Sequence, residues 1–373
     1  MIPAPVDDCP RFLAINMAAG TNLDEAGAVA LAKSTALVSA NPGQIDRWFP
    51  QMRSARPDGR WLGYLNATFG PDTKPAAWYG LDASGNRLHS QQYPANFVML
   101  PFDPDWVADR VAEAGKLVSL GFDGVMLDMC GPYPTRPHYL DGILVDPRTK
   151  EPYTAAAWIA DTAALAKAVK TALGSNVVLG NGLESGTMLE ALNSATIDLL
   201  VPGGMDGGLA EQWMEELTAG GDWGAAEGLP ELVAERSAAA CCMVKPWKVT
   251  DPKLLDQIHR YSLATFHLGK TGLSFYGYTA ANTPEAIITD SPYEHVAIGY
   301  PLGAAHANAD GHWSRPFETG LALANPSSQT VVVHLRHHAH WWGGRALVWT
   351  DLDGQQVTDV TLAPQSGEVL TVS

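Results

Sequence analysis

The 373-residue sequence is poor in cysteine and in basic residues, and both shortages exclude classes of protein. Its four cysteines, Cys9, Cys130, Cys241 and Cys242, include no C-x-x-C pair, so the spacing typical of zinc and redox motifs is missing. We expect them to be buried thiols, because free cysteine is most often found in protein cores. Lysine and arginine number 24 against 40 acidic residues, and the net charge of −16 disfavours nucleic acid or an anionic membrane as a partner.

Long apolar runs are also missing. No stretch of about 18 apolar residues without charge occurs, so no transmembrane helix is expected. The first residues, MIPAPVDDCPRF, have neither the basic nor the apolar segment of a signal peptide, so none is expected in this numbering. The sequence therefore leaves the location of the protein open. It is the cytoplasm or, if the substrate is a surface glycan, the cell exterior or a virion. Apolar residues themselves are plentiful at 46%, which is enough to build a large core.

Short apolar runs alternate with helix-like stretches over about the first 300 residues. This alternation is typical of a parallel sheet whose strands are joined by helices. Eight strands are predicted and most precede a helix, so a (β/α)8 TIM barrel, which needs about 250 residues, is favoured over an open doubly wound sheet. The predicted strands are residues 12–17, 61–66, 97–102, 124–128, 177–180, 208–211, 240–245 and 272–276.

The pattern changes at about residue 301 to short alternating runs joined by turns such as DLDGQ and APQSG. We therefore expect a barrel domain over residues 1–300 and a small antiparallel β-sandwich domain over residues 301–373. The segment HLRHHAHWW in the second domain contains four histidines that are compatible with a metal site on one strand face. Because it lies away from the expected active site, neither a metal nor another cofactor is expected. These histidines are His334, His337, His338 and His340.

Barrel enzymes have their active sites at the carboxyl ends of the strands, so the polar residues there are the candidates. Asp128 ends the predicted fourth strand, Glu184 follows the fifth and Glu211 ends the sixth. Glycoside hydrolysis requires two carboxyl groups, because one protonates the leaving oxygen and the other attacks the anomeric carbon or activates water. The residues expected to contact substrate are Asn16, Asn66, Tyr133, Asn181, Lys245, Trp247 and Tyr276.

A family resemblance is carried by the segments GFDGVMLD, NFVMLPFDPDWVADRVAEAGKLVSLGFDG and WSRPFETGLALANPS…VTLAPQSGEVL. They resemble the hypothetical glycoside hydrolase-like family 15 from about residue 78 to residue 370. The resemblance implies a barrel glycosidase with a C-terminal β domain. It matches Asp128 to the aspartate of strand four and the D-G-x-x-x-E pattern of Asp206 and Glu211 to strand six, where the glycine-rich VPGGMDGG departs from the family pattern.

Analogy with α-galactosidase-like barrels implies roles for the carboxyl groups. Asp128 is the expected nucleophile and Glu211 the expected acid/base, with Glu184 as the alternative acid/base. This assignment implies a retaining mechanism with the two carboxyl groups about 5–5.5 Å apart, whereas a gap of about 6.5–9.5 Å would indicate inversion. It rests on analogy between folds and only raises an expectation.

The sequence therefore predicts a glycoside hydrolase that cleaves O-glycosidic bonds of a polysaccharide or oligosaccharide without a cofactor. A bacterial cell-wall glycan such as arabinan or galactan is one candidate substrate. Two alternatives are left open. The first is a non-catalytic glycan-binding surface or phage-tail protein on the same barrel. The second is a lyase or aldolase that forms a Schiff base on Lys245.

Overall fold

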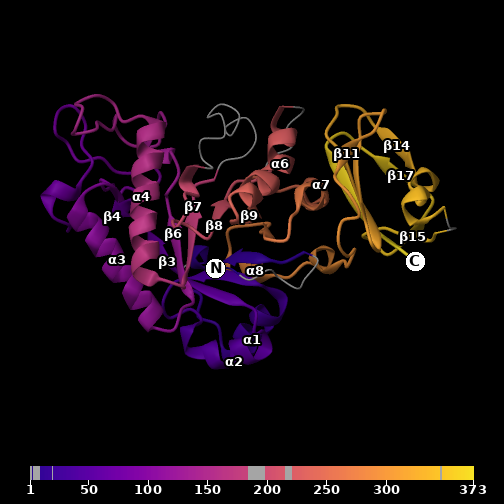
Figure 1. Ribbon diagram of the computed structural model, residues 1–373, viewed down its shortest axis with the longest axis horizontal. Helices are drawn as coiled ribbons and strands as arrows, with labels where there is room; N and C mark the ends of the chain where they lie inside the picture. Colours follow the sequence, from indigo (N-terminus) through magenta and orange to yellow (C-terminus); the bar gives the residue numbers. More distant parts are fainter. Residues whose placement is uncertain (1, 3–8, 19, 184–197, 215–220, 345–346) are drawn as a thin grey trace.

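The computed structural model describes residues 2, 9–18, 20–183, 198–214, 221–344 and 347–373, with backbone only for residues 221–227. In this part of the chain, eight parallel strands form one sheet in the order β1-β2-β3-β6-β7-β8-β9-β10. A parallel bridge between Arg11 and Tyr276 joins the last strand to the first, so the sheet is a nearly closed barrel (Figure 1). The strands are β1 (Phe12–Ala14), β2 (Leu37–Ala40), β3 (Arg60–Asn66), β6 (Gly124–Asp128), β7 (Val177–Asn181), β8 (Gly207–Ala210), β9 (Ala239–Val244) and β10 (Ser274–Tyr278).

Helices cover the outside of the barrel, and capping residues explain where several of them begin. Asp103, Thr154 and Asp251 each accept a hydrogen bond from a backbone N–H in the first turn of the helix that follows. Proline occupies the start of α3 and of α7, where a backbone N–H would have no intrahelical partner. The helices are α1 (Glu25–Ser34), α2 (Phe49–Ala55), α3 (Pro104–Ser119), α4 (Ala155–Leu173), α6 (Gly221–Glu235), α7 (Pro252–Gly269) and α8 (Pro284–Ile288).

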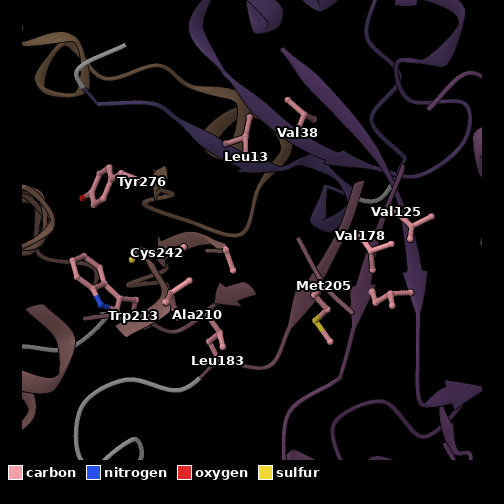
Figure 2. Packing of buried hydrophobic residues seen from close by; sticks show 14 of the residues in the cluster. Leu13, Val38, Val125, Val178, Leu183, Met205, Ala210, Trp213, Cys242 and Tyr276 are labelled. Atoms are coloured by element: carbon pink, nitrogen blue, oxygen red, sulfur yellow. The ribbon is translucent and has the colours of Figure 1, made fainter. Parts of the chain in front are cut away.

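Side chains along the barrel strands alternate between the barrel interior and the layer beneath the helices. In β9, Cys241 and Met243 belong to the interior cluster, whereas Cys242 and Val244 belong to the outer cluster. Figure 2 shows part of this outer cluster, with Val125 and Cys242 among the labelled side chains. The neighbouring Cys241 and Cys242 therefore point to opposite faces. All four cysteines are buried thiols, which confirms the prediction.

An Asp-Gly pair stands at the amino-terminal end of two barrel strands, at residues 123–124 and 206–207. Gly124 has φ of 156°, and a Cβ placed on it would lie 1.9 Å from a carbonyl oxygen of β7. A Cβ placed on Gly207 would lie 2.6 Å from a carbonyl oxygen of β9. Neighbouring strands approach so closely at both points that only glycine fits.

The barrel fold is confirmed, but one predicted strand is wrong and one real strand was missed. Residues 97–102 contribute only β5 (Phe97–Val98), which pairs with β4 (Phe69–Gly70) in a separate two-stranded sheet. The missed strand is β2, whose short apolar sequence LVSA follows α1 so closely that it resembles the end of that helix. Because the two errors cancel in the count, Asp128 still ends the fourth strand, whereas Asn66 ends the third strand instead of the second.

Antiparallel strands follow the barrel and pack against α7. Gln257 of α7 donates to the backbone oxygens of Pro364 and Gln365, both at 3.0 Å, and Arg260 Nη1 lies 3.0 Å from Glu368 Oε2. Figure 1 shows these strands, coloured orange to yellow, on one side of the barrel beyond α7. One sheet has the order β11-β12-β13-β18-β15-β16, and β14 pairs with β17. The strands are β11 (His306–Ala307), β12 (Trp313–Phe317), β13 (Gly320–Asn325), β14 (Val331–His334), β15 (Trp349–Thr350), β16 (Gln356–Val357), β17 (Asp359–Leu362) and β18 (Ser366–Val372).

The histidine-rich segment lies mostly in 3-10 helices, not on one strand face. β14 ends at His334, and the 3-10 helices Leu335–His337 and Ala339–Trp342 follow it. Across the described residues, no group of three histidine, cysteine or carboxylate side chains is arranged to hold a metal ion. None of the described helices is long and apolar enough to cross a membrane. Further 3-10 helices span Ile15–Met17, Asp46–Trp48, Ala76–Trp78, Tyr133–Thr135 and Pro292–His295.

Candidate active site

Five consecutive strands of the barrel, β3, β6, β7, β8 and β9, bring polar side chains together at their carboxyl ends. The polar residue of each strand stands an even number of positions after a side chain of the interior cluster. Because side chains alternate along a strand, it points into the barrel mouth. This alternation places carboxylate, amide and ammonium groups on one inward-facing surface. The residues are Asn66, Asp128, Asn181, Glu211 and Lys245.

The Asp128 carboxylate accepts hydrogen bonds on both oxygens. Its Oδ1 accepts from the backbone N–H of Met129 at 2.8 Å and from Asn181 Nδ2 at 2.7 Å. Its Oδ2 accepts from the Tyr64 hydroxyl at 2.7 Å, with Asn66 Nδ2 at 3.5 Å. The Asn66 amide is held in this orientation because its oxygen accepts from two backbone N–H groups of the following loop, at 3.1 and 2.8 Å. Donors on both oxygens stabilise the ionised carboxylate.

Burial and a neighbouring charge act against those hydrogen bonds. Burial first, and the charge of Glu211 second, raise the pKa of Asp128 to about 6, although the hydrogen bonds from Tyr64, Asn181 and Met129 lower it. Burial, with the charge of Asp128, raises the pKa of the Tyr64 hydroxyl far above its ordinary value. Tyr64 therefore stays protonated and donates to Asp128, whose carboxyl group ionises only as the pH rises through about 6.

A single amide nitrogen joins the two carboxylates. Asn181 Nδ2 donates to Asp128 Oδ1 and also to Glu211 Oε2. Two hydrogen bonds of ordinary length that diverge by about 120° from one NH2 group place their acceptor oxygens roughly 5 Å apart. The other oxygen of Glu211 accepts a hydrogen bond from the Lys245 ammonium, which in turn lies 4.7 Å from the centre of the Trp247 ring.

These groups line a cavity of about 690 Å³ at the barrel mouth. Its volume is typical of a site for a small molecule or a few sugar units. The rest of the wall combines flat rings with amide and hydroxyl groups, which suits sugars because they present both apolar faces and hydroxyls. The lining includes Asn16, Phe69, Ser90, Gln92, Tyr93, Asn96, Tyr133, Tyr139, Gln212, Trp247 and Asn282.

Most of the residues predicted to contact substrate meet at this cavity. Tyr133 donates through its hydroxyl to Gln212 Oε1 at 3.1 Å, and Trp247 Nε1 donates to the backbone oxygen of Thr279 at 3.1 Å. Glu184, the alternative acid/base, lies outside the described residues. The predicted residues that line the cavity are Asn16, Asn66, Asp128, Tyr133, Asn181, Glu211, Lys245 and Trp247.

Tyr276 lies elsewhere, so the prediction that it contacts substrate is wrong. It is fully buried in the outer core cluster, where Figure 2 shows it with Trp213 and Cys242. Its hydroxyl is hydrogen-bonded to that of Ser262 on α7 at 2.8 Å. Because Phe275 points into the barrel interior, the next side chain along β10 must point toward the helices.

Two residues that shape the site were not predicted from the sequence. Tyr64 stands two positions before Asn66 in the same strand, so the period of two would have placed both side chains on one face. Met129 follows Asp128 in a left-handed conformation with φ of 61°, and Thr68 Oγ1 donates to its carbonyl oxygen at 2.8 Å. Nothing in the sequence indicates that turn, because methionine seldom adopts positive φ.

Solved structures of similar fold cover almost the whole chain. Amy13B of Eubacterium rectale has a TM-score of 0.58 at 9% identity, with 100% of this chain and 97% of that chain covered. The α-amylase of Geobacillus thermoleovorans has a TM-score of 0.51 at 12% identity, with 98% of each chain covered. The cyclic α-maltosyl-(1→6)-maltose hydrolase of Arthrobacter globiformis has a TM-score of 0.52 at 11% identity, with 97% of this chain and 98% of that chain covered. At these identities the similarity shows the fold alone.

The fold and the site thus define a barrel of the kind found in glycoside hydrolases. A family model described as hypothetical glycosyl hydrolase family 15 matches residues 58–321, and the chain belongs to this family. The resemblance deduced from the sequence is therefore confirmed. No curated protein matches the chain. Membership of this family implies a carbohydrate as the substrate.

Proposed function

We propose that this protein is a retaining glycoside hydrolase of polysaccharides or oligosaccharides, with Asp128 as nucleophile and Glu211 as acid/base. The observation that carries the proposal is the hydrogen-bond donor that both carboxylates share, Asn181 Nδ2. One donor between two acceptors implies a separation of roughly 5–5.5 Å, which is the separation found in retaining enzymes. An inverting enzyme needs a wider gap of about 6.5–9.5 Å for its water, so the shared donor favours retention.

The reaction proceeds in two steps at the anomeric carbon of the sugar. In the first step, ionised Asp128 attacks this carbon while Glu211 gives its proton to the glycosidic oxygen. The carbon–oxygen bond breaks, the leaving sugar departs and the glycosyl group is bound to Asp128 as an ester. In the second step, the Glu211 carboxylate takes a proton from water, whose oxygen attacks the same carbon and releases Asp128.

The surroundings of the two carboxyl groups support these roles. Donors on both oxygens of Asp128 favour the ionised form that a nucleophile needs. Glu211 faces the cavity with 24% of its side chain exposed, so it can exchange a proton with a leaving oxygen and then with water. Lys245 donates to Glu211 and favours its carboxylate, which forms when the proton leaves and acts as the base in the second step.

The test is a screen of plant and bacterial cell-wall polysaccharides, arabinan and galactan included, with released reducing ends as the measurement. The variants are Asp128→Asn, Glu211→Gln and Glu184→Gln. Asp72→Asn, an exposed aspartate outside the cavity, is the matched control. We expect release by the wild-type protein and the control, loss in Asp128→Asn, and strong slowing in Glu211→Gln but not in Glu184→Gln.

Each outcome separates the proposal from an alternative. Release that survives in Asp128→Asn would remove the nucleophile, and slowing in Glu184→Gln alone would move the acid/base to that residue. Proton NMR of the first product should show the anomeric configuration of the substrate, and the opposite configuration would overturn retention. Binding without release by the wild-type protein would favour the glycan-binding alternative. Borohydride trapping of substrate on Lys245 would favour the lyase or aldolase.

A further inference from the structure

We infer that the substrate crosses the cavity in one fixed direction, with Trp247 as the platform for the sugar that leaves. The inference rests on the proposed function and adds to it an assignment of the two halves of the cavity. The half beyond Glu211, formed by residues 245–249 and Gln212, takes the leaving group. The half beyond Asp128, formed by β3 and the loop that carries Tyr93, takes the sugar whose anomeric carbon reacts.

The direction follows from the order of the strands around the barrel mouth. Asn66, Asp128, Asn181, Glu211 and Lys245 come from five strands that are neighbours in the sheet, so they form a row along the rim. In the proposed reaction the nucleophile must reach the anomeric carbon, and the acid must reach the oxygen of the leaving sugar. The leaving sugar therefore lies at the Glu211 end of the row, where the next side chains are Lys245 and Trp247.

The Trp247 ring is held in place before any sugar binds. Its Nε1 donates to the backbone oxygen of Thr279 at 3.1 Å, and its backbone N–H donates to the carbonyl oxygen of Lys245 at 2.7 Å. The Lys245 ammonium lies over one face of this ring and also donates to Glu211, so the other face is the platform. A fixed ring next to the acid binds a sugar face at a small cost in conformational entropy.

The other half of the cavity has a different character. Tyr64 and Asn66 surround Asp128 there, and Tyr93 at the rim is 55% exposed. A sugar in this half keeps its contacts whichever leaving group it carries. A sugar in the Trp247 half is absent when the leaving group is a simple phenol. Substrates that differ only in the leaving group therefore separate the two halves.

The experiment compares Trp247→Ala with Tyr93→Ala on two substrates of the same sugar. One is the oligosaccharide that the wild-type protein cleaves, and the other is the corresponding 4-nitrophenyl glycoside. For Trp247→Ala we expect kcat/KM to fall about ten-fold or more on the oligosaccharide and less than about three-fold on the nitrophenyl glycoside. For Tyr93→Ala we expect both values to fall by the same factor. Trp247→Phe keeps a ring and should recover most of the lost activity.

A second measurement uses the intermediate. An added oligosaccharide can replace water in the second step, when Glu211 takes a proton from its hydroxyl and that oxygen attacks the anomeric carbon. This acceptor must occupy the leaving-group half, so Trp247→Ala should lower the ratio of transfer to hydrolysis. Equal losses on both substrates, with an unchanged transfer ratio, would overturn the inference and leave the proposed function intact. No release by the wild-type protein from any glycan would instead remove the proposed function and the inference with it.

Discussion

Each end of the barrel holds two acidic side chains, and the surroundings of these side chains differ between the two ends. At the amino-terminal end, Asp123 and Asp206 each accept a hydrogen bond from a backbone N–H of the adjoining strand, at 2.9 Å in both cases. Each also binds a cation, since Arg53 Nη1 lies 2.7 Å from Asp123 and Lys170 Nζ lies 2.7 Å from Asp206. The arginine and the lysine balance the charges of these carboxylates, and the carboxylates tie neighbouring strands together.

At the carboxyl-terminal end, the carboxylates of Asp128 and Glu211 are held next to one another with Asn181 between them, and a single cation, Lys245, donates to Glu211. Their mutual repulsion is part of what raises the pKa of Asp128. The acidic side chains thus join strands to helices at one end of the barrel and lie close together at the other, which is the end that holds the active site in barrel enzymes.

The largest effect is expected for Glu211→Gln at the carboxyl-terminal end of the barrel. Loss of a general acid lowers the rate about 10²–10⁴-fold, so kcat/KM on the polysaccharide should fall by this factor. The melting temperature should stay close to that of the wild type, because the substitution removes the repulsion with Asp128 but also the charge partner of Lys245. A variant that loses activity only in proportion to a loss of folded protein would show that Glu211 is structural.

The next largest effect is expected for Gly124→Ala at the opposite end. A Cβ 1.9 Å from a carbonyl oxygen, on a residue with φ of 156°, forces two strands apart. Strain and lost packing of this kind cost about 3–5 kcal/mol of unfolding free energy. Denaturant unfolding measures the change. Gly115→Ala is the control, because a Cβ there meets no atom within 4 Å and alanine favours the helix by about 0.5–1 kcal/mol.

A smaller loss of stability is expected for Asp206→Asn. The substitution leaves the ammonium of Lys170 without its carboxylate, which costs about 1–3 kcal/mol for a half-buried charged hydrogen bond. Activity per folded molecule should be unchanged because Asp206 is at the far end of the barrel. In a double-mutant cycle, Lys170→Met should recover part of the loss. Fully additive losses in that cycle would show that the pair does not interact.

Local periodicity decides which features of the fold and of the site can be predicted from the sequence. The alternation of strands and helices predicts the barrel, and strand ends predict Asp128, Asn181 and Glu211, because both follow from local periodicity. The inward direction of Tyr64 follows from that of Asn66 by the same periodicity, whereas the outward direction of Tyr276 depends on the phase of β10. That phase is set by which neighbouring residue fills the barrel interior, so it becomes visible only in the packing.

The strand errors have a similar cause. The run FVMLPF is as apolar as a barrel strand because Val98 and Leu100 are buried in a separate cluster with Trp158 of α4, and periodicity cannot distinguish the two cases. The role of Asp206 was also hidden. The D-G-x-x-x-E pattern places Asp206 and Glu211 five residues apart, which is a whole strand length, so the two residues lie at opposite ends of the barrel.

The smallest effect is expected for Tyr64→Phe, measured in the pH dependence of kcat/KM. Asp128 must be ionised to attack, so activity should rise with pH through its pKa of about 6. The hydrogen bond from Tyr64 lowers that pKa, so its removal should move the rise in activity to higher pH. Tyr139→Phe is the matched control, since its hydroxyl contacts Met129 Sδ at 3.4 Å and donates no hydrogen bond to Asp128. A rise that stays in place in Tyr64→Phe, or moves to lower pH, would show that Asp128 is not the group whose ionisation starts the reaction.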